Sequence, residues 1–243
     1  MITLLHRVAA AVFATAAVAA HPAPTYPVNV PPSATLHYTI RSRQSGVTID
    51  GSGTVDWTVS GRNFVARSQA NAMLLGKILE ARSVGIIDRL GLEPTSFTQK
   101  RFRKDETTTT FDRATGQIRF SASSNTYPID GAVQDRNSMV WQLVSVARAA
   151  PARFKPGSSW NFFVAGPKDA DPWTFKVVGR DRISTSLGTL DAVHLQKEPP
   201  SSGGQRVDLW LAPAREWYPV RLRYTDADGD YIEQTLTQID RRH

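Results

Sequence analysis

Short runs in which apolar and polar residues alternate fill most of this chain, and they restrict what it can fold into. In the first run Leu36, Tyr38 and Ile40 alternate with polar residues, and similar runs recur up to residue 239. A period of two is typical of a strand with one buried face. We expect about eleven or twelve strands, several joined by turns such as Asp228-Gly229. The chain is therefore predicted to be mainly β.

One segment, Asp135–Ala149, has the pattern of an amphipathic helix. Asp135 or Asn137 can cap its start, and Pro151 ends it. Its apolar residues recur at helical spacing and form one stripe: Met139, Val140, Leu143, Val144 and Ala147. A helix with a single apolar stripe must pack on another element, and here only a sheet is available. A second, short helical crossover is expected over Asn71–Lys77, before a long strand.

A sheet with so many strands rarely stays flat, because strand twist makes it curl or close. We predict a large curved antiparallel sheet, or an incomplete β-barrel, with the helix packed across its open side. A single β-rich domain is expected over residues 33–243, since no Gly/Ser-rich linker divides this region. A curved sheet of this kind often contains an apolar cavity.

The N-terminus has the organisation of a secretory signal peptide. Arg7 precedes an Ala-rich apolar stretch of about 13 residues, which is too short to span a bilayer. We expect cleavage after Ala20, and an N-terminal anchor or core helix is the alternative. Residues 21–32 contain five prolines and are predicted to form a linker. No later apolar run is long enough to cross a membrane, so a periplasmic or secreted protein without a transmembrane segment in its mature chain is predicted.

The net charge and the absence of cysteine limit the covalent modifications and the kinds of binding partner that we expect. The chain has no Cys, which excludes disulfides and an N-terminal lipid-modified cysteine. The net charge is +7, and the basic residues are scattered apart from a cluster at Lys100–Lys104 (KRFRK). We interpret this cluster as a solvated edge strand whose charges prevent edge pairing, or else as an anion-contacting patch. Export argues against a nucleic-acid partner.

The sequence contains no complete motif of a known catalytic site. His37 and His194 are the histidines inside the domain body, and no Ser lies in a G-x-S-x-G turn. Carboxylate pairs for glycoside hydrolysis could come from distant strands, and the best-placed acids lie in or beside apolar segments: Glu80, Asp88, Asp135 and Asp208. A helix cap explains Asp135 more simply, and a solvent-facing strand position explains Asp208. No catalytic residue and no cofactor is predicted.

The acidic segment Asp226, Asp228, Asp230 and Glu233 could bind a hard cation through oxygen atoms. A calcium-binding loop needs Gly at its sixth position and Glu at its twelfth, whereas Gly229 is fourth and Glu233 eighth here. We therefore predict a polar hairpin turn and no metal site.

Aromatic residues are the other candidates for function. Six tryptophans are spread over the domain, and most are expected in the core. Trp210 alternates with Leu209 and Leu211, so either both faces of its strand are covered or Trp210 faces a ligand. The candidate ligand-binding residues are Trp210, Trp141, Trp173, Leu143 and Met139.

Three segments resemble an exported bacterial family known as domain of unknown function 3108. They are Gly85–Pro94 (GIIDRLGLEP), Gln134–Leu143 (QDRNSMVWQL) and Leu209–Val220 (LWLAPAREWYPV). They match a GL-x-P turn, a QD-x-x-S helix start and a W-L…P-V strand pair. The resemblance covers most of residues 33–239, implies an exported β-rich fold and assigns no chemistry. The architecture is also similar, in shape alone, to periplasmic carriers of the LolA/LolB kind.

We predict that the protein is non-enzymatic and binds a hydrophobic or amphipathic envelope component, such as a lipid, an acyl chain or a lipidated protein. The binding groove would be partly covered by the Asp135–Ala149 helix, and a filled interior would contradict it. One alternative is a polysaccharide- or peptidoglycan-associated module, binding or hydrolytic, with exposed aromatics and a carboxylate pair. Another is an envelope assembly or scaffold protein. The sequence specifies neither the ligand nor the oligomeric state.

Overall fold

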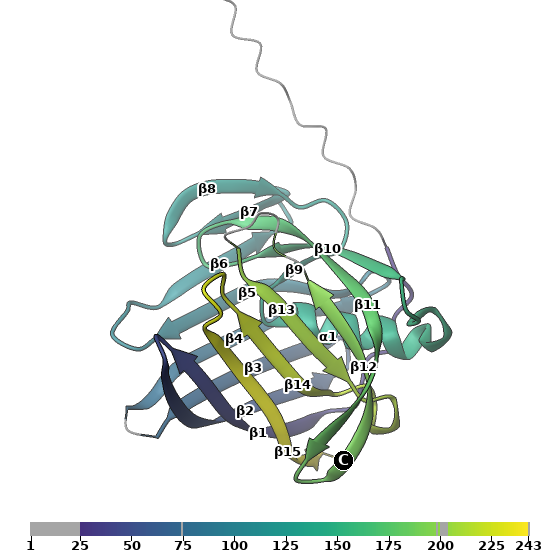
Figure 1. The fold of residues 1–243 in the computed structure, drawn as a ribbon. Helices are drawn as coiled ribbons and strands as arrows, with labels where there is room; N and C mark the ends of the chain where they lie inside the picture. The colour runs from purple at the N-terminus through teal and green to yellow at the C-terminus, as the bar shows by residue number, and fades with distance from the viewer. Residues whose placement is uncertain (1–24, 74, 198, 200–203, 243) are drawn as a thin grey trace, which may run out of the picture.

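The computed structural model describes residues 25–73, 75–197, 199 and 204–242 (Figure 1). The predicted signal peptide and cleavage site lie outside these residues. Fifteen strands form one sheet, which is strongly curved but not closed into a barrel. One α-helix, α1 (Ser138–Ala149), and two 3₁₀ turns, η1 (Pro151–Arg153) and η2 (Pro213–Arg215), complete the described residues. The mainly β prediction is confirmed.

The strands follow one another in the sheet almost in chain order, as a continuous meander. Their bounds are β1 (Ala34–Gln44), β2 (Val47–Ser60), β3 (Asn63–Ala72), β4 (Gly76–Asp88), β5 (Gly91–Arg101), β6 (Thr107–Asp112), β7 (Gln117–Phe120), β8 (Ser123–Pro128), β9 (Val133–Asp135), β10 (Ser159–Ala165), β11 (Ala170–Thr185), β12 (Gly188–Lys197), β13 (Arg206–Leu211), β14 (Pro219–Thr225) and β15 (Tyr231–Arg241).

The spatial order is β8-β7-β6-β5-β4-β3-β2-β1-β15-β14-β13-β12-β11-β10-β9. The first strand therefore pairs with the last, and this β1–β15 ladder joins the two halves of the chain. Among the described strands, only β9 and β10 pair in parallel. The remaining neighbours pair antiparallel, and short turns join several of them, such as β1 to β2 and β2 to β3.

The two edge regions of the sheet, one around β5 to β8 and the other around β9 and β10, approach each other without forming a ladder. Gln134 Nε2 donates to the Leu92 carbonyl over 2.6 Å, and Thr109 Oγ1 donates to the Gly166 carbonyl over 2.8 Å. Buried apolar residues from both ends pack between these bonds, including Phe97, Phe111, Ile118 and Val133. Side-chain contacts thus hold the sheet in its curved form, since no backbone pairing closes it.

The helix α1 lies inside the curve. Met139, Leu143 and Val144 pack against strand residues such as Trp160 and Leu209 in one core cluster. On a neighbouring side of the helix, Trp141 stacks on Trp57 with ring centroids 4.5 Å apart. We call the face of the sheet that packs on α1 the inner face. The predicted packing of a helix across the open side of the sheet is confirmed.

The helix begins three residues later than predicted. Asp135 ends β9, and its Oδ1 accepts hydrogen bonds from the backbone N–H groups of Asn137 and Ser138, both over 2.8 Å. Asn137 is the N-cap residue, but its side chain makes no capping bond. Asp135 therefore lies outside the helix but accepts hydrogen bonds from backbone N–H groups at its start, which have no partner within the helix.

Three local predictions were wrong or only partly correct. Asn71–Lys77 is not helical: β3 ends at Ala72, and Gly76 has a positive φ of 68° that opens the hairpin into β4. Lys100–Lys104 is an edge strand only in part: Lys100 and Arg101 end β5 and pair with β4 but not with β6, and the chain then turns at residues 102–104. The strands also outnumber the prediction, since a parallel strand as short as β9 has no detectable period.

The described part of the predicted linker, residues 25–32, forms neither helix nor strand and lies against the domain. Tyr26 and Val28 pack on the core beside α1. The indole N–H of Trp57 donates to the Pro31 carbonyl over 3.0 Å, and the Tyr218 hydroxyl donates to the Pro32 carbonyl over 2.8 Å. These bonds attach the segment to the end of the sheet where the helix finishes.

Candidate functional site at the open end of the sheet

The strands begin and finish at two opposite sides of the curved sheet, and these two sides, which we call its ends from here on, carry different elements. Near one end, Arg148 in the last turn of α1 pairs with Glu216, in the β13–β14 connection. At the other end lie the turns joining β1 to β2, β3 to β4, β5 to β6 and β14 to β15 (Figure 1, left). We call this second end the open end.

Solvent reaches the inner face at the open end. Along β15, inward-facing Leu236 is fully buried, Gln234 is half-buried and Ile232 is 39% exposed. Ile49 on β2 is 40% exposed, whereas Trp57, further along the same face, is fully buried. Both exposed isoleucines are register partners of Ser42 on β1. The inner face is therefore filled beside the helix and open at the far end.

Small residues line much of this opening. The register places Gly51 opposite Ala72 and Gly53 opposite Ala70, all on the inner face. A Cβ at Gly53 would lie only 3.3 Å from Ile40 Cδ1, so the strands pack closely at this position and a small residue is needed there.

A buried lysine lies on the inner face of β12. Lys197 ends β12 opposite Phe175 and Val207, and it is 7% exposed. Its Nζ lies 4.7 Å from the ring centroid of Trp173, and it forms no ion pair with any residue that the structure describes. Burial lowers the pKa of Lys197, and the charge of Asp171 opposes this effect. A buried ammonium without a close counter-charge is costly and marks a site of interest.

Asp171 and Arg136 lie beside Lys197 and Trp173, and we call these four residues the interior cluster, although Arg136 is half-exposed and pairs with Asp169 over 3.7 Å. The indole N–H of Trp173 donates to Asp171 Oδ2 over 3.0 Å. Burial raises the pKa of Asp171, against the charges of Lys197 and Arg136. The Arg136 guanidinium lies over Gly166, where an added Cβ would come within 2.8 Å of it. The buried Nε of Arg136 has no hydrogen-bond partner among the described residues.

The predicted ligand-binding residues do not gather in one place. Trp173 belongs to the interior cluster, whereas Met139, Leu143 and Trp141 are buried in the core around the helix. Trp210 lies on the outer face and is 9% exposed. The space beneath the helix is thus occupied by side chains, so the prediction of a binding groove covered by this helix was wrong. Lys197 was not predicted from the sequence. It alternates with Val193 and Leu195 on one face of the same strand, and a charged residue in that pattern is the signal that could have identified it.

Trp210 is held in a polar network on the outer face. It stacks on His194 with centroids 4.3 Å apart, and its indole N–H donates to Asp181 Oδ2 over 2.7 Å. His194 Nε2 lies 2.9 Å from Asp208 Oδ1. Burial alone would raise the pKa of Asp208, but hydrogen bonds from His194 and Gln196 and the charge of Arg206 hold it below its ordinary value. The other ring nitrogen of His194, Nδ1, lies 3.3 Å from Asp181 Oδ2.

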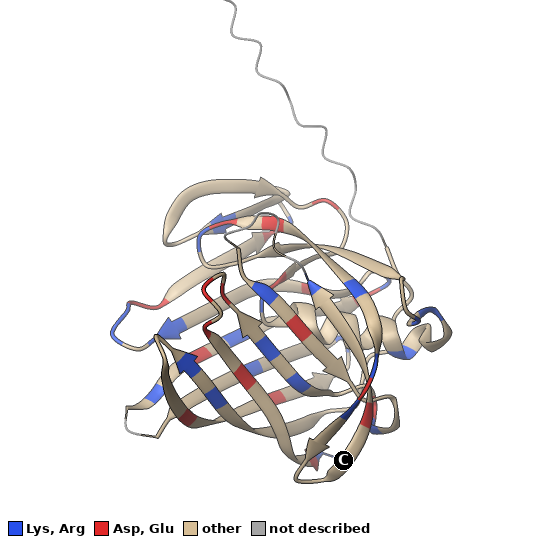
Figure 2. Cartoon of the chain, viewed as in Figure 1, with Lys and Arg blue, Asp and Glu red and all other residues tan. Residues whose placement is uncertain are grey.

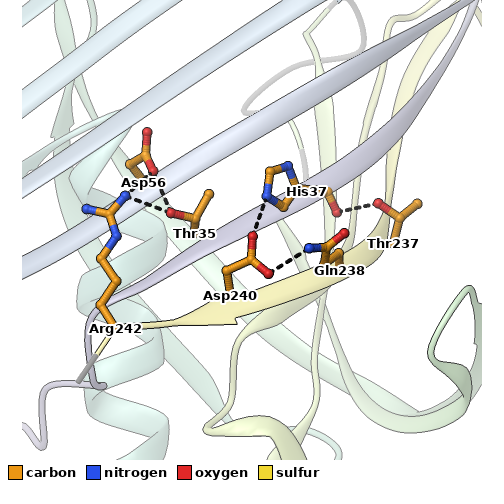
Figure 3. Close-up of polar contacts among 7 residues, drawn as sticks. All are labelled: Thr35, His37, Asp56, Thr237, Gln238, Asp240 and Arg242. Atoms are coloured by element: carbon orange, nitrogen blue, oxygen red, sulfur yellow. Dashed lines mark hydrogen bonds and ion pairs between the residues drawn. The ribbon is translucent and has the colours of Figure 1, made fainter.

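His37 lies in a surface network that joins β1, β2 and β15 (Figure 3). Its Nε2 is 2.9 Å from Asp240 Oδ2, and Gln238 donates to the other oxygen of Asp240 over 2.7 Å. Close by, Arg242 bonds both Thr35 and Asp56 over 2.8 Å. These contacts connect neighbouring strands at an exposed surface, and they resemble sheet-stabilising pairs more than a reactive centre.

Two motifs of the sequence resemblance meet in a buried polar node. Asp135 accepts a hydrogen bond from Ser83 Oγ, and Ser138 Oγ donates to Gln134 Oε1 over 2.9 Å. Gln142 Oε1 accepts from the Leu92 backbone N–H over 2.8 Å. Burial raises the pKa of Asp135, and its hydrogen bonds oppose this effect. The node fastens the β4–β5 hairpin to the start of α1, which is a structural role.

One carboxylate, Glu93, was not predicted from the sequence, whereas its neighbour Asp88 was. Glu93 is buried and forms an ion pair with Arg113 over 3.2 Å. Burial raises the pKa of Glu93, Arg113 opposes it and Asp88 adds to it. The other predicted acids are engaged separately: Glu80 pairs with Lys77, and Asp208 with Arg206.

The outer face carries a hollow of about 850 Å³ across β14, β15, β1, β2 and β3, which we call the outer hollow. Its charged lining is paired: Arg41 Nε lies 3.4 Å from Asp50 Oδ1, and Arg221 Nε lies 3.8 Å from Glu233 Oε1. Its volume falls in the range of small-ligand sites, and eight of its thirteen lining residues are polar or charged.

The acidic β14–β15 turn uses its carboxylates locally. Asp230 Oδ2 accepts from the Ser45 backbone N–H over 2.7 Å, and Asp228 Oδ1 accepts from the Asp230 N–H over 3.1 Å. Within the described residues, no group of three or more His, Cys, Asp or Glu side chains is placed to hold a metal ion. In the same residues, no helix is both long and apolar enough to span a membrane.

A family model described as "Protein of unknown function (DUF3108)" matches residues 34–237. No protein of curated function matches the sequence.

Among solved structures, a β-barrel-like protein of domain of unknown function DUF1849 from Brucella abortus is similar. It is 12% identical, the match covers 89% of this chain and all of that one, and the TM-score is 0.59, which supports a shared fold. MucB in its complex with MucA matches at 11% identity over 87% of this chain and 51% of that chain, with a TM-score of 0.34. The Mycobacterium tuberculosis lipoprotein LppX matches at 10% identity over 86% and 87%, with a TM-score of 0.31.

Proposed function

The chain belongs to the DUF3108 family, whose function is unknown, and we propose that it is a non-enzymatic binding protein of the bacterial envelope. Its ligand is a hydrophobic or amphipathic envelope component: a lipid, an acyl chain or a lipidated protein. The ligand enters the open end of the curved sheet. The observation that carries the proposal is the exposed inner face there, with Lys197 buried beside it.

The chemistry of the opening suits an amphipathic molecule. Inward-facing Ile232, Leu222 and Ala70 offer apolar contact, and each methylene of an acyl chain buried there contributes about 0.8 kcal/mol. Lys197 and Arg136 offer positive charge beside them. A carboxylate or phosphate head group would give the buried ammonium the counter-charge it lacks among the described residues.

The proposal keeps Trp173 as a ligand contact, because its ring lies against Lys197 at the opening. Met139, Leu143 and Trp141 then support the site from the core. Trp210 stays a candidate contact only for a ligand of the outer face. A periplasmic location, after removal of residues 1–20, is part of the proposal and rests on the leader of the sequence.

Native mass spectrometry of the mature protein, purified from its own periplasm and followed by lipid extraction, tests this function. We expect a co-purifying lipid or acylated molecule. The variant Ala70→Trp should lose it, because the added indole fills the opening. Arg67→Trp, an exposed position on the outer face of the same strand, should retain it. A ligand-free wild-type mass, or equal loss in both variants, would count against the site.

A second candidate, a polysaccharide- or peptidoglycan-associated module, is favoured by the outer hollow with its paired Arg and acidic side chains. Sedimentation with insoluble peptidoglycan tests it. Binding that Arg41→Ala weakens, while Ala70→Trp leaves it unchanged, would support this alternative over the carrier.

A further inference from the structure

Exposed apolar side chains collect at the tips of three hairpins. Eight large hydrophobic residues are exposed in the described chain, and five of them lie on the β1–β2, β3–β4 and β5–β6 hairpins. These five define the tip row: Val47 at 60%, Ile49 at 40%, Met73 at 79%, Leu75 at 54% and Phe102 at 39% exposure. Single exposed apolar residues are ordinary, but a concentration of them marks an interaction site.

The three hairpins are consecutive in the sheet, so their tips lie next to one another (Figure 1). Strands are spaced about 4.8 Å apart, which places neighbouring tips about 10 Å from each other. A sixth exposed residue, Ile232, follows the adjacent β14–β15 turn. The tip row therefore forms one edge of the open end, where the proposed ligand enters.

Basic residues surround the tip row, as the blue segments at these turns in Figure 2 show. Five of them form no ion pair with a described residue: Arg43, Lys100, Arg101, Arg103 and Lys104. The Arg103 guanidinium lies 4.9 Å from the Phe102 ring centroid, so charge and apolar surface are presented together. Asp105 and Glu106 follow directly, and Asp226, Asp228 and Asp230 lie on the adjacent β14–β15 turn, so the unpaired bases are concentrated at the β1–β2 and β5–β6 tips.

We infer that the tip row docks the protein onto an anionic lipid bilayer, with the open end facing the membrane. Apolar side chains at a membrane interface bury themselves at the boundary between head groups and acyl chains. Lysine and arginine beside them are attracted to anionic lipid phosphates. Charge complementarity selects this occupant, because a purely apolar partner would leave the unpaired bases without a counter-charge. The inference goes beyond the proposed function, since docking requires no bound ligand.

Flotation of the mature protein with vesicles tests docking. We expect it to float with phosphatidylcholine vesicles that contain phosphatidylglycerol, and to bind pure phosphatidylcholine about tenfold more weakly. The double variant Met73→Ser/Leu75→Ser should weaken binding to the anionic vesicles about tenfold. Lys100→Gln/Arg103→Gln should weaken it and reduce its salt dependence.

The chain offers a matched control. Val178 and Leu187 are exposed to 50% and 38% but lie away from the tip row, on β11 and in the β11–β12 turn. Val178→Ser/Leu187→Ser should float like the wild type. Equal binding by tip-row and control variants, or no flotation of the wild type, would overturn the inference. So would a dimer in size-exclusion chromatography that the tip-row variant converts to a monomer, because the tips would then bind a second copy.

Docking and ligand binding can fail separately. Ala70→Trp should lose ligand in native mass spectra and still float, whereas Met73→Ser/Leu75→Ser should keep ligand and fail to float. Loss of flotation in Ala70→Trp would show that bound ligand, and not the tip row, anchors the protein.

Discussion

The ammonium group of Lys197 lies 4.7 Å from the centre of the Trp173 ring on the inner face of the sheet. Both residues are buried, and Asp171 bonds the Trp173 indole over 3.0 Å. Elsewhere along β12 the inward positions carry Val193 and Leu195, which pack in the core. A cation is therefore kept where the sheet would be more stable with an apolar residue, which is typical of a binding site.

Replacing this cation should stabilise the empty protein. We expect Lys197→Met to raise the free energy of unfolding at pH 7 by about 1 kcal/mol, because it removes a buried charge and keeps the volume. Since burial lowers the pKa of Lys197, the penalty is complete below that lowered pKa and disappears as pH rises towards the unfolded value, about 10.4. Urea denaturation at pH 7 and pH 10 measures both effects.

The same variant should lose affinity for an acidic ligand while gaining stability. The matched control is Lys176→Met, on the exposed face of β11, which should change neither property. A Lys197→Met protein that is less stable than the wild type at pH 7 would mean that the ammonium is satisfied in the free protein.

Asp135 should show the opposite pH dependence. Burial raises its pKa, so its contribution to stability is greatest at low pH and falls as pH rises from about 3.9 through the raised pKa. Asp135→Asn removes this fall and keeps an acceptor for the helix N–H groups. Its free energy of unfolding at pH 7 should lie within about 1 kcal/mol of the wild type.

Asp135→Ala, by contrast, should lose about 2–4 kcal/mol, because Ser83 and two backbone N–H groups lose their acceptor. Thermal denaturation followed by circular dichroism from pH 3 to pH 8 distinguishes the two variants. Identical losses in both would show that the negative charge itself is required.

Asp208 should stabilise the fold through its ionised form. Its pKa is held below the ordinary value, so its contribution is present above about pH 3.9 and is lost as pH falls through the lowered pKa. We expect His194→Ala to cost about 2 kcal/mol at pH 7, because it removes a partner of a buried carboxylate and a stacking partner of Trp210. Chemical denaturation measures this cost. A decrease in the free energy of unfolding of less than about 0.5 kcal/mol would contradict a stabilising role.

Gly91 should be essential for the junction between hairpin and helix. Its φ is +100°, and a Cβ there would collide with the Gln142 amide, which bonds Leu92. Gly91→Ala should cost about 2–3 kcal/mol, from backbone strain plus the collision. Gly116→Ala is the control, since Gly116 also has a positive φ but open space around it. A cost of about 1 kcal/mol is expected there, and equal costs would rule out the collision.

The sequence predicted the architecture well where the pattern was long and regular. Alternation identified strands such as β1 and β15, and the stripe of Met139 and Leu143 identified α1. Gly76 explains the error at Asn71–Lys77, because helical spacing of apolar residues there also fits a hairpin whose turn needs a positive φ. The strand β9 was missed, since three residues cannot establish a period.

The candidate site was harder to predict, because it depends on the distance along each strand from the helix. Ile232 and Leu236 share one face and the same alternation, yet one is 39% exposed and the other buried. Nothing local in the sequence separates them. The tryptophans were better predictors of the core than of a site, since Trp141 and Trp57 fill the space beside the helix. Lys197 could have been predicted as a site residue, because it is a charged residue on the same strand face as the apolar Val193 and Leu195.

Photocrosslinking with a diazirine-bearing fatty acid tests the central claim most directly. After irradiation and digestion, mass spectrometry should locate the label on inward-facing residues of the open end, such as Leu79, Leu222 and Ile232. Excess unlabelled fatty acid should abolish it, and Ala70→Trp should prevent it. Labels confined to the outer hollow, or labelling that Ala70→Trp leaves unchanged, would contradict a ligand site inside the curved sheet.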